Sequence, residues 1–153
     1  MIVYMDLEGT VIDEWSSMTL INIKKLAHFL HINNVEVISI FSFAINDAAD
    51  VQRFEAELRE TLVEVLGVEI NITDTSKASD EICERELMDF EDVCYFMNKF
   101  RTFTEFAIHN CQDQTVVLLD DEVQNTDMKF KDNNTRVVTI DVTSDHWEDT
   151  LIN

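Results

Sequence analysis

The chain is poor in basic residues, in glycine and in long apolar runs, and these shortages argue against several classes of protein. Only 11 Lys and Arg accompany 31 Asp and Glu, and the formal net charge of -20 argues against unaided binding to nucleic acid or to anionic membranes. No apolar run approaches the roughly 18 residues of a membrane span, and no basic segment typical of a signal peptide precedes the first apolar stretch. We expect a cytoplasmic protein that binds a cationic partner or a divalent metal.

Cysteine is also scarce. Cys83, Cys94 and Cys111 are odd in number and lack Cys-Xaa-Xaa-Cys spacing, so we expect reduced, mostly buried thiols in place of a disulfide framework or a zinc knuckle. The 153 residues, 46% of them hydrophobic, suffice for the core of one ordinary domain. We therefore treat residues 1–153 as a single domain.

Apolar runs alternate with helical patterns along the chain. Strands are predicted at residues 2–5, 35–41, 68–73, 115–119 and 136–142. Helices are predicted at about 17–31, 47–66 and 79–110, the last broken near Asn98, with short helical segments after Asp121 and from Ser144. Continuous apolar strands separated by helices are typical of a parallel sheet covered on both faces. The predicted fold is α/β, a Rossmann-like three-layer α/β/α sandwich around a mainly parallel five-stranded sheet.

Polar side chains follow three of the predicted strands. Asp6 follows the first, Ser42 the second, and Asp120 and Asp121 the fourth. In open parallel sheets, ligands bind beyond the carboxyl ends of the strands, so these side chains are expected to converge there. Carboxylate oxygens suit magnesium and hydroxyl groups suit phosphate oxygens. The three carboxylates would repel one another strongly, which favours a bound cation.

The first of these strand ends carries Asp6-Leu7-Glu8-Gly9-Thr10-Val11-Ile12-Asp13. This stretch resembles the first motif, Asp-Xaa-Asp-Gly-Thr-(two residues)-Asp, of the haloacid dehalogenase (HAD)-like hydrolase superfamily. Ser42 matches the second motif, a Ser or Thr that ends an apolar strand, and the pair Asp120-Asp121 matches the fourth. The resemblance covers nearly the whole chain.

The third motif of that superfamily is a lysine near the start of the helix before the fourth strand. Lys99 is the preferred match, with Lys77 and Arg101 as alternatives. Each residue also has a simpler interpretation, because Lys99 can be a solvated helix lysine, Ser42 a hydroxyl that satisfies backbone groups, and the acidic pair a helix cap.

The resemblance implies a Mg²⁺-dependent phosphatase that forms an aspartyl-phosphate intermediate. Asp6 would be the nucleophile, while Glu8 would protonate the leaving oxygen and later activate water. Lys99 and Ser42 would bind phosphate oxygens, with backbone amides of Gly9 and Thr10. The implied magnesium ligands are the Asp6 side chain, the Glu8 backbone carbonyl, Asp120 and Asp121.

Glu8 departs from the usual motif, which has Asp at this position. A similar Asp-Xaa-Glu-Gly-Thr sequence is found in the enolase-phosphatase branch, so acid-base work need not be lost. The additional methylene of Glu would move the proton donor relative to the leaving oxygen. The alternative hypothesis is a catalytically inactive HAD-like protein that acts as an acidic protein-interaction module.

The spacing of the motifs leaves no room for a large cap module. The 36 positions from Asp6 to Ser42 and the 57 from Ser42 to Lys99 are filled by the predicted elements. The resemblance therefore suggests a capless or minimally capped catalytic domain with an open site. Its substrate would be a phosphorylated small molecule or a phosphoprotein, with polynucleotides disfavoured by charge, and a homo-oligomer stays open.

Overall fold

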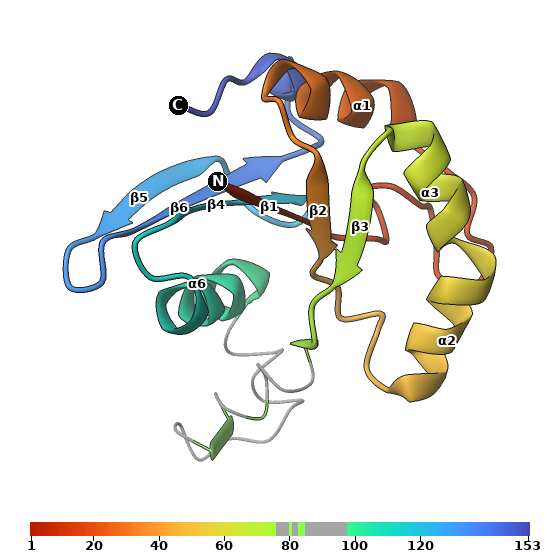
Figure 1. The fold of residues 1–153 in the computed structure, drawn as a ribbon, viewed down its shortest axis with the longest axis horizontal. Helices are drawn as coiled ribbons and strands as arrows, with labels where there is room; N and C mark the ends of the chain where they lie inside the picture. Colours follow the sequence, from red (N-terminus) through yellow and green to blue (C-terminus); the bar gives the residue numbers. More distant parts are fainter. Residues whose placement is uncertain (76–79, 81–82, 85–97) are drawn as a thin grey trace.

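The computed structural model describes residues 1–75, 80, 83–84 and 98–153, and a six-stranded sheet runs through them (Figure 1). The strands lie in the order β3-β2-β1-β4-β6-β5, and all neighbours are parallel except β5 and β6. Their bounds are β1 Ile2–Met5, β2 Val37–Ile40, β3 Glu69–Ile72, β4 Thr115–Asp120, β5 Thr126–Phe130 and β6 Thr135–Asp141. This confirms an α/β architecture with a mostly parallel sheet, compatible with a Rossmann-like fold.

Helices cover both faces of the sheet. One face carries α1, α2 and α3, and the other carries α6 (Figure 1). Their bounds are α1 Ile23–Ile32, α2 Ala48–Glu57, α3 Arg59–Leu66 and α6 Lys99–Asn110, and a short 3₁₀ helix, η1, spans Trp147–Asp149.

Successive residues of β1 belong to two separate hydrophobic clusters. Val3 and Met5 pack in the cluster that includes residues of α1 to α3, whereas Tyr4 packs in the cluster that includes Phe103 and Ala107 of α6. Adjacent strand residues point to opposite faces, so a strand buried on both faces must be apolar throughout. This explains the continuous apolar pattern of β1 and anchors the strand end that precedes Asp6.

The prediction of five strands was wrong by one strand. A short helical segment was expected after Asp121, but β5 forms there and pairs antiparallel with β6. β5 is mostly exposed and has no apolar run, so its sequence gives little strand signal. It is held instead by the ladder and by cross-strand contacts, including the Arg136–Asp127 ion pair at 2.6 Å.

Two other predicted helices differ from the structure at their ends. The helix predicted from residue 17 begins at Ile23, because Leu20 forms an antiparallel bridge with Ile12 and so belongs to the preceding loop. The helix predicted from Ser144 is shortened to η1. The predicted helical region 79–97 lies largely outside the described residues.

The helix predicted at 47–66 is divided at Leu58 into α2 and α3. Its expected ends are confirmed. Asp47 caps α2 by accepting a hydrogen bond from the Asp50 amide at 2.9 Å, and Gly67 adopts the left-handed conformation after α3, with φ of 70°.

No helix in the described part of the chain is long and apolar enough to cross a membrane. Cys83 and Cys111 form no disulfide, as expected; Cys111 is buried and Cys83 is partly buried. Cys94 lies outside the described residues.

Replacing Gly67 tests the backbone cost of its conformation. A Cβ atom at Gly67 would meet no other atom within 4 Å, so Gly67→Ala changes backbone energy without a clash. We expect the free energy of unfolding to fall by about 1–2 kcal/mol. Gly67→Asn is the control and should lose less, because Asn tolerates this conformation. Equal losses in urea unfolding would contradict this explanation.

Candidate functional site

Three carboxylates meet at the carboxyl edge of the sheet. Oxygen atoms of Asp6, Asp120 and Asp121 all lie within 4.8 Å of one another. Met5 pairs with Leu119 in the β1–β4 ladder, so the residues that follow them, Asp6 and Asp120, lie side by side. Asp6 is 8% exposed and Asp120 is fully buried. The predicted convergence of these side chains is therefore present in the structure.

Burial makes the charged form of this cluster costly. It raises the pKa of Asp6 to about 6, although the nearby Lys99 ammonium lowers that pKa and Asp120 adds to the rise. Burial also raises the pKa of Asp120, again opposed by Lys99. The pKa of Asp121 is raised first by burial and then by the Asp6 charge. A positive charge bound among the three would offset both causes.

Lys99 supplies one such charge by direct contact with two of the carboxylates. Its Nζ atom lies 3.1 Å from Asp6 Oδ1 and 3.3 Å from Asp120 Oδ2, and the residue is 9% exposed. Asn98 caps α6 by accepting a hydrogen bond from the Arg101 amide at 3.0 Å, which places Lys99 at the first position of the helix.

Two aromatic rings also face the Lys99 ammonium. Its Nζ atom lies 4.6 Å from the centre of the Phe43 ring and 5.5 Å from that of Phe41. Such cation–π contacts help to hold a lysine that is withdrawn from water. Of the two alternatives to Lys99, Arg101 is exposed and Lys77 lies outside the described residues.

A cavity of about 340 Å³ adjoins the carboxylates. Its walls bring together four of the predicted site residues with others from neighbouring loops. The lining residues are Asp6, Glu8, Ser42, Phe43, Ala44, Asn98, Lys99 and Glu122. A phosphoryl group bound in this cavity would lie beside Asp6, Lys99 and Ser42.

Ser42 is held by the loop that follows β2. The residue is 2% exposed, and its Oγ atom accepts a hydrogen bond from the Ala44 amide at 3.2 Å. The Thr75 hydroxyl donates to the backbone oxygens of Ser42 at 3.2 Å and of Ile45 at 3.0 Å. A residue just after β3 thereby fixes the backbone that carries Ser42.

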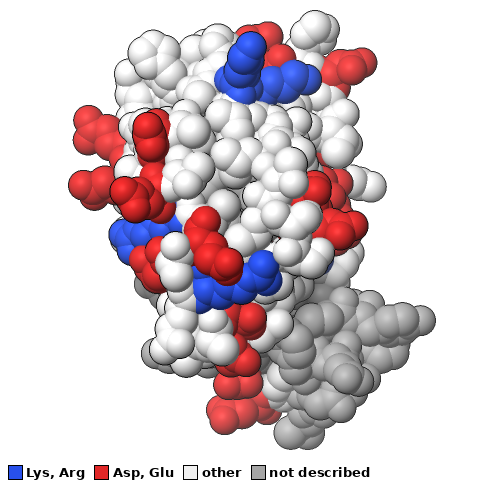
Figure 2. Space-filling model, turned by 90° about the vertical axis from the view of Figure 1, so that its right-hand side faces the viewer, with Lys and Arg blue, Asp and Glu red and all other residues white. Residues whose placement is uncertain are grey.

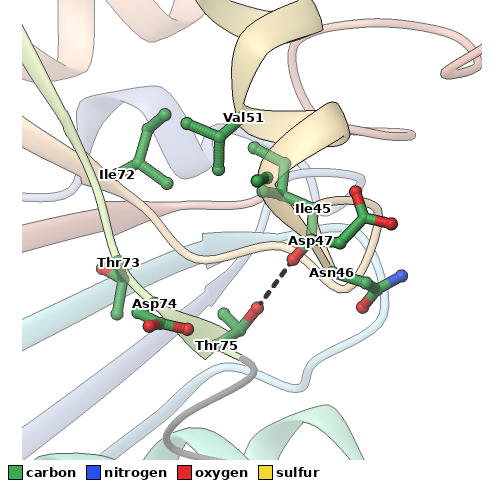
Figure 3. A pocket seen from close by; sticks show the side chains of 9 residues that line it. Ile45, Asn46, Asp47, Val51, Ile72, Thr73, Asp74 and Thr75 are labelled. Atoms are coloured by element: carbon green, nitrogen blue, oxygen red, sulfur yellow. Dashed lines mark hydrogen bonds between the residues drawn. The ribbon is translucent and has the colours of Figure 1, made fainter.

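Thr75 also lines a second cavity, of about 410 Å³, between the ends of β2 and β3 and the start of α2 (Figure 3). Its walls combine apolar side chains with carboxylates, an amide and hydroxyls. They are formed by Ile45, Asn46, Asp47, Ala48, Val51, Ile72, Thr73, Asp74 and Thr75. The loop after β2 thus separates this hollow from the one that contains Asp6.

Gly9 allows the loop after β1 to approach Asp121. Its φ is 76°, and a Cβ atom at this position would lie 2.0 Å from Asp121 Oδ2. The Gly9 and Thr10 amides, which were predicted to bind phosphate, take part in hydrogen bonds within this loop. These amides already donate to Ile12 O at 2.8 Å and Leu7 O at 3.2 Å, because the chain turns tightly here. The function of Gly9 in this structure is close packing.

Glu8 lies on the wall of the cavity but outside the carboxylate cluster. Its side chain is exposed, and Oε2 accepts a hydrogen bond from the Trp15 amide at 3.0 Å. The side chain is therefore separated in position and environment from Asp6, although the two residues are two apart in the chain. Such a difference permits the two carboxylates to have different roles.

The donor set at the strand ends fits magnesium. Carboxylate oxygens are hard ligands, and Asp121 Oδ1 is buried without a hydrogen-bond partner among the described residues. Asp120 Oδ1, by contrast, accepts a hydrogen bond from the Glu122 amide at 2.8 Å. A cation at this cluster would satisfy the Asp121 oxygen and reduce the repulsion.

Comparisons with models of protein families, with curated proteins and with solved structures returned no match.

Sequence reasoning missed several residues at the site. Phe43, Thr75 and Trp15 act through contacts between segments distant in the chain, and no local pattern marks them. Asn98 carries a recognisable signal, because Asn is a preferred residue immediately before a helix. Its position agrees with the predicted break near Asn98, since α6 begins at Lys99.

The raised pKa of Asp6 predicts a dependence of stability on pH. Between about pH 4 and 6 the folded protein binds more protons at Asp6 than the unfolded chain does, so this group lowers stability as pH rises. The metal-free Asp6→Asn variant lacks this charge. At each pH, the unfolding free energy of the wild type is subtracted from that of Asp6→Asn. We expect this difference to be about 1–3 kcal/mol larger at pH 7.5 than at pH 4.5.

Urea unfolding of both proteins in the presence of a chelator measures this difference. Taking the difference between the two proteins removes the pH dependence of the acidic groups that lie away from Asp6, so that the remainder reports Asp6 and the carboxylates that interact with it. A difference that stays constant over this pH range would contradict the assignment.

Proposed function

We propose that the protein is a Mg²⁺-dependent phosphohydrolase of the HAD-like superfamily that acts through an aspartyl-phosphate on Asp6. The observation that carries the proposal is the group of three carboxylates in which the Lys99 ammonium contacts the two buried ones, Asp6 and Asp120. Its position at the carboxyl edge of a mostly parallel sheet supports the same proposal.

In the first step, a carboxylate oxygen of Asp6 attacks the phosphorus of a phosphomonoester. The bond from phosphorus to the ester oxygen breaks, and its electron pair stays with that oxygen, which takes a proton from Glu8. In the second step, Glu8 removes a proton from water as the water oxygen attacks phosphorus. The bond between Asp6 and phosphorus breaks, so inorganic phosphate leaves and Asp6 is restored.

The other side chains align and stabilise the phosphoryl group. Lys99 and Ser42, both on the cavity wall, bind its oxygens, and Lys99 also keeps Asp6 oriented. Asp6, Asp120 and Asp121, with the Glu8 backbone carbonyl, would hold magnesium, which would neutralise the negative charge that develops on the phosphoryl oxygens. Phosphoryl transfer depends chiefly on such alignment and charge neutralisation.

The substrate proposed is a phosphorylated small molecule or a phosphoprotein. The cavity of about 340 Å³ can accept a phosphoryl group, and the low content of basic residues disfavours polynucleotides. The cytoplasm remains the proposed location.

The second candidate, an inactive acidic interaction module, has weaker support. On the face that carries α2 and α3, Asp and Glu side chains are dispersed and Lys and Arg side chains lie among them (Figure 2). Ion pairs such as Arg53–Glu57 and Arg59–Glu55 divide the acidic surface further. The described residues of this face form no continuous acidic patch for a basic partner.

Release of phosphate from p-nitrophenyl phosphate and from a panel of phosphorylated metabolites tests the proposal. We expect turnover with Mg²⁺, loss of turnover with a chelator, and a decrease of about 1,000-fold or more in Asp6→Asn, which lacks the nucleophile. Glu55→Gln, which removes an exposed carboxylate on α2, is the control and should match the wild type. Absence of turnover by the wild type, or unchanged turnover by Asp6→Asn, would refute the proposal.

A further inference from the structure

The Glu8 carboxylate is held by a backbone group of the following loop. Its Oε2 atom accepts a hydrogen bond from the Trp15 amide at 3.0 Å. An exposed Glu side chain without such a partner would sample several rotamers. The position of the amide therefore determines where the Glu8 carboxylate stands relative to the cavity.

Internal hydrogen bonds fix the shape of this loop, residues 13–19. Asp13 Oδ1 accepts from the Ser17 hydroxyl at 2.8 Å and from the Thr19 amide at 2.9 Å. The Asp13 amide donates to Thr19 O at 2.9 Å, and an antiparallel bridge between Ile12 and Leu20 closes its base. These bonds hold the loop together internally, and its orientation on the protein depends on contacts outside it.

Arg53 of α2 makes two such contacts. Its guanidinium carbon lies 5.0 Å from the centre of the Trp15 ring, and Nη2 donates a hydrogen bond to Ser16 O at 3.3 Å. Arg53 is held in turn by Glu57, with Nε 2.7 Å from Oε2. A planar guanidinium suits this combination of ring stacking and directed hydrogen bonding. The Arg53 side chain links the loop to a helix packed against the sheet.

We infer that Arg53, through Trp15, positions the Glu8 carboxylate for proton transfer to the leaving oxygen. The inference rests on the proposed phosphohydrolase function. Arg53 is a positioning residue, since it contacts neither the cavity nor the carboxylate. Proton transfer requires the donor within hydrogen-bond reach of the leaving oxygen, so a small displacement of the loop should reduce it. The contact also restrains the additional torsion that Glu has in comparison with Asp.

The test compares kcat/KM for p-nitrophenyl phosphate and phenyl phosphate. A poorer leaving group depends more on protonation, and kcat/KM reports the step that breaks its bond without the later hydrolysis of the intermediate. In Arg53→Ala, we expect about a 10-fold loss for phenyl phosphate and less than about 2-fold for p-nitrophenyl phosphate. Glu8→Gln should show the same preference more strongly.

Matched variants separate positioning from general destabilisation. Arg59→Ala removes a similar ion pair, with Glu55, from the neighbouring helix and should leave both kcat/KM values unchanged. Trp15→Phe keeps a ring for Arg53 and should stay close to the wild type, whereas Trp15→Ala should resemble Arg53→Ala. Arg53→Lys keeps the charge over the ring and should restore part of the loss.

The possible results distinguish this inference from the proposed function. Equal losses for the two esters in Arg53→Ala, or no loss for either, would overturn the role of Arg53 alone. A wild-type protein that cleaves neither ester with Mg²⁺, nor any phosphate of the metabolite panel, would refute the proposed function together with this inference.

Discussion

Parallel pairing of β1 with β4 is the interaction on which the rest of the site depends. The ladder runs from Ile2 and Val116 to Met5 and Leu119, and the Asp6 amide extends it by donating to Leu119 O at 3.0 Å. This register places the Asp6 and Asp120 carboxylates next to each other at the carboxyl edge of the sheet. A shift of one residue would turn one of these side chains to the opposite face. The two hydrophobic clusters that enclose β1 and β4 make such a shift costly, and thereby keep the carboxylates together.

The carboxylate cluster opposes the stability of the fold around it. Asp6 and Asp120 lie where apolar side chains would be more stable, and burial disfavours their charged forms. Several contacts offset part of this cost. They are the Lys99 ammonium, the Glu122 amide on Asp120, and the two rings beside Lys99. The core must supply the remaining stabilisation. Sites that combine burial with like charges are typical of places where function takes precedence over stability.

The parts of this architecture that local pattern determines could be predicted from the sequence. Apolar runs identified the strands of the parallel core, and the strand ends correctly suggested that Asp6, Ser42 and Asp120 come together. β5 was missed because its stability comes from pairing with β6. The start of α1 was misplaced because the spacing of Leu20 fits a helix face, while its actual partner is Ile12. Both errors concern contacts between separate segments, and the local sequence pattern does not show such contacts.

The Lys99 ammonium has a consequence for the choice of metal ion. Three ionised carboxylates and one ammonium leave two negative charges, which a divalent cation would balance. A sodium or potassium ion would supply only one charge, so one of the two negative charges would stay unbalanced even with the ammonium in contact with two of the ligands. If the site binds a metal as proposed, this charge balance would favour a divalent ion before coordination geometry has any effect. A site of this kind could remain free of the abundant monovalent ions and still respond to magnesium.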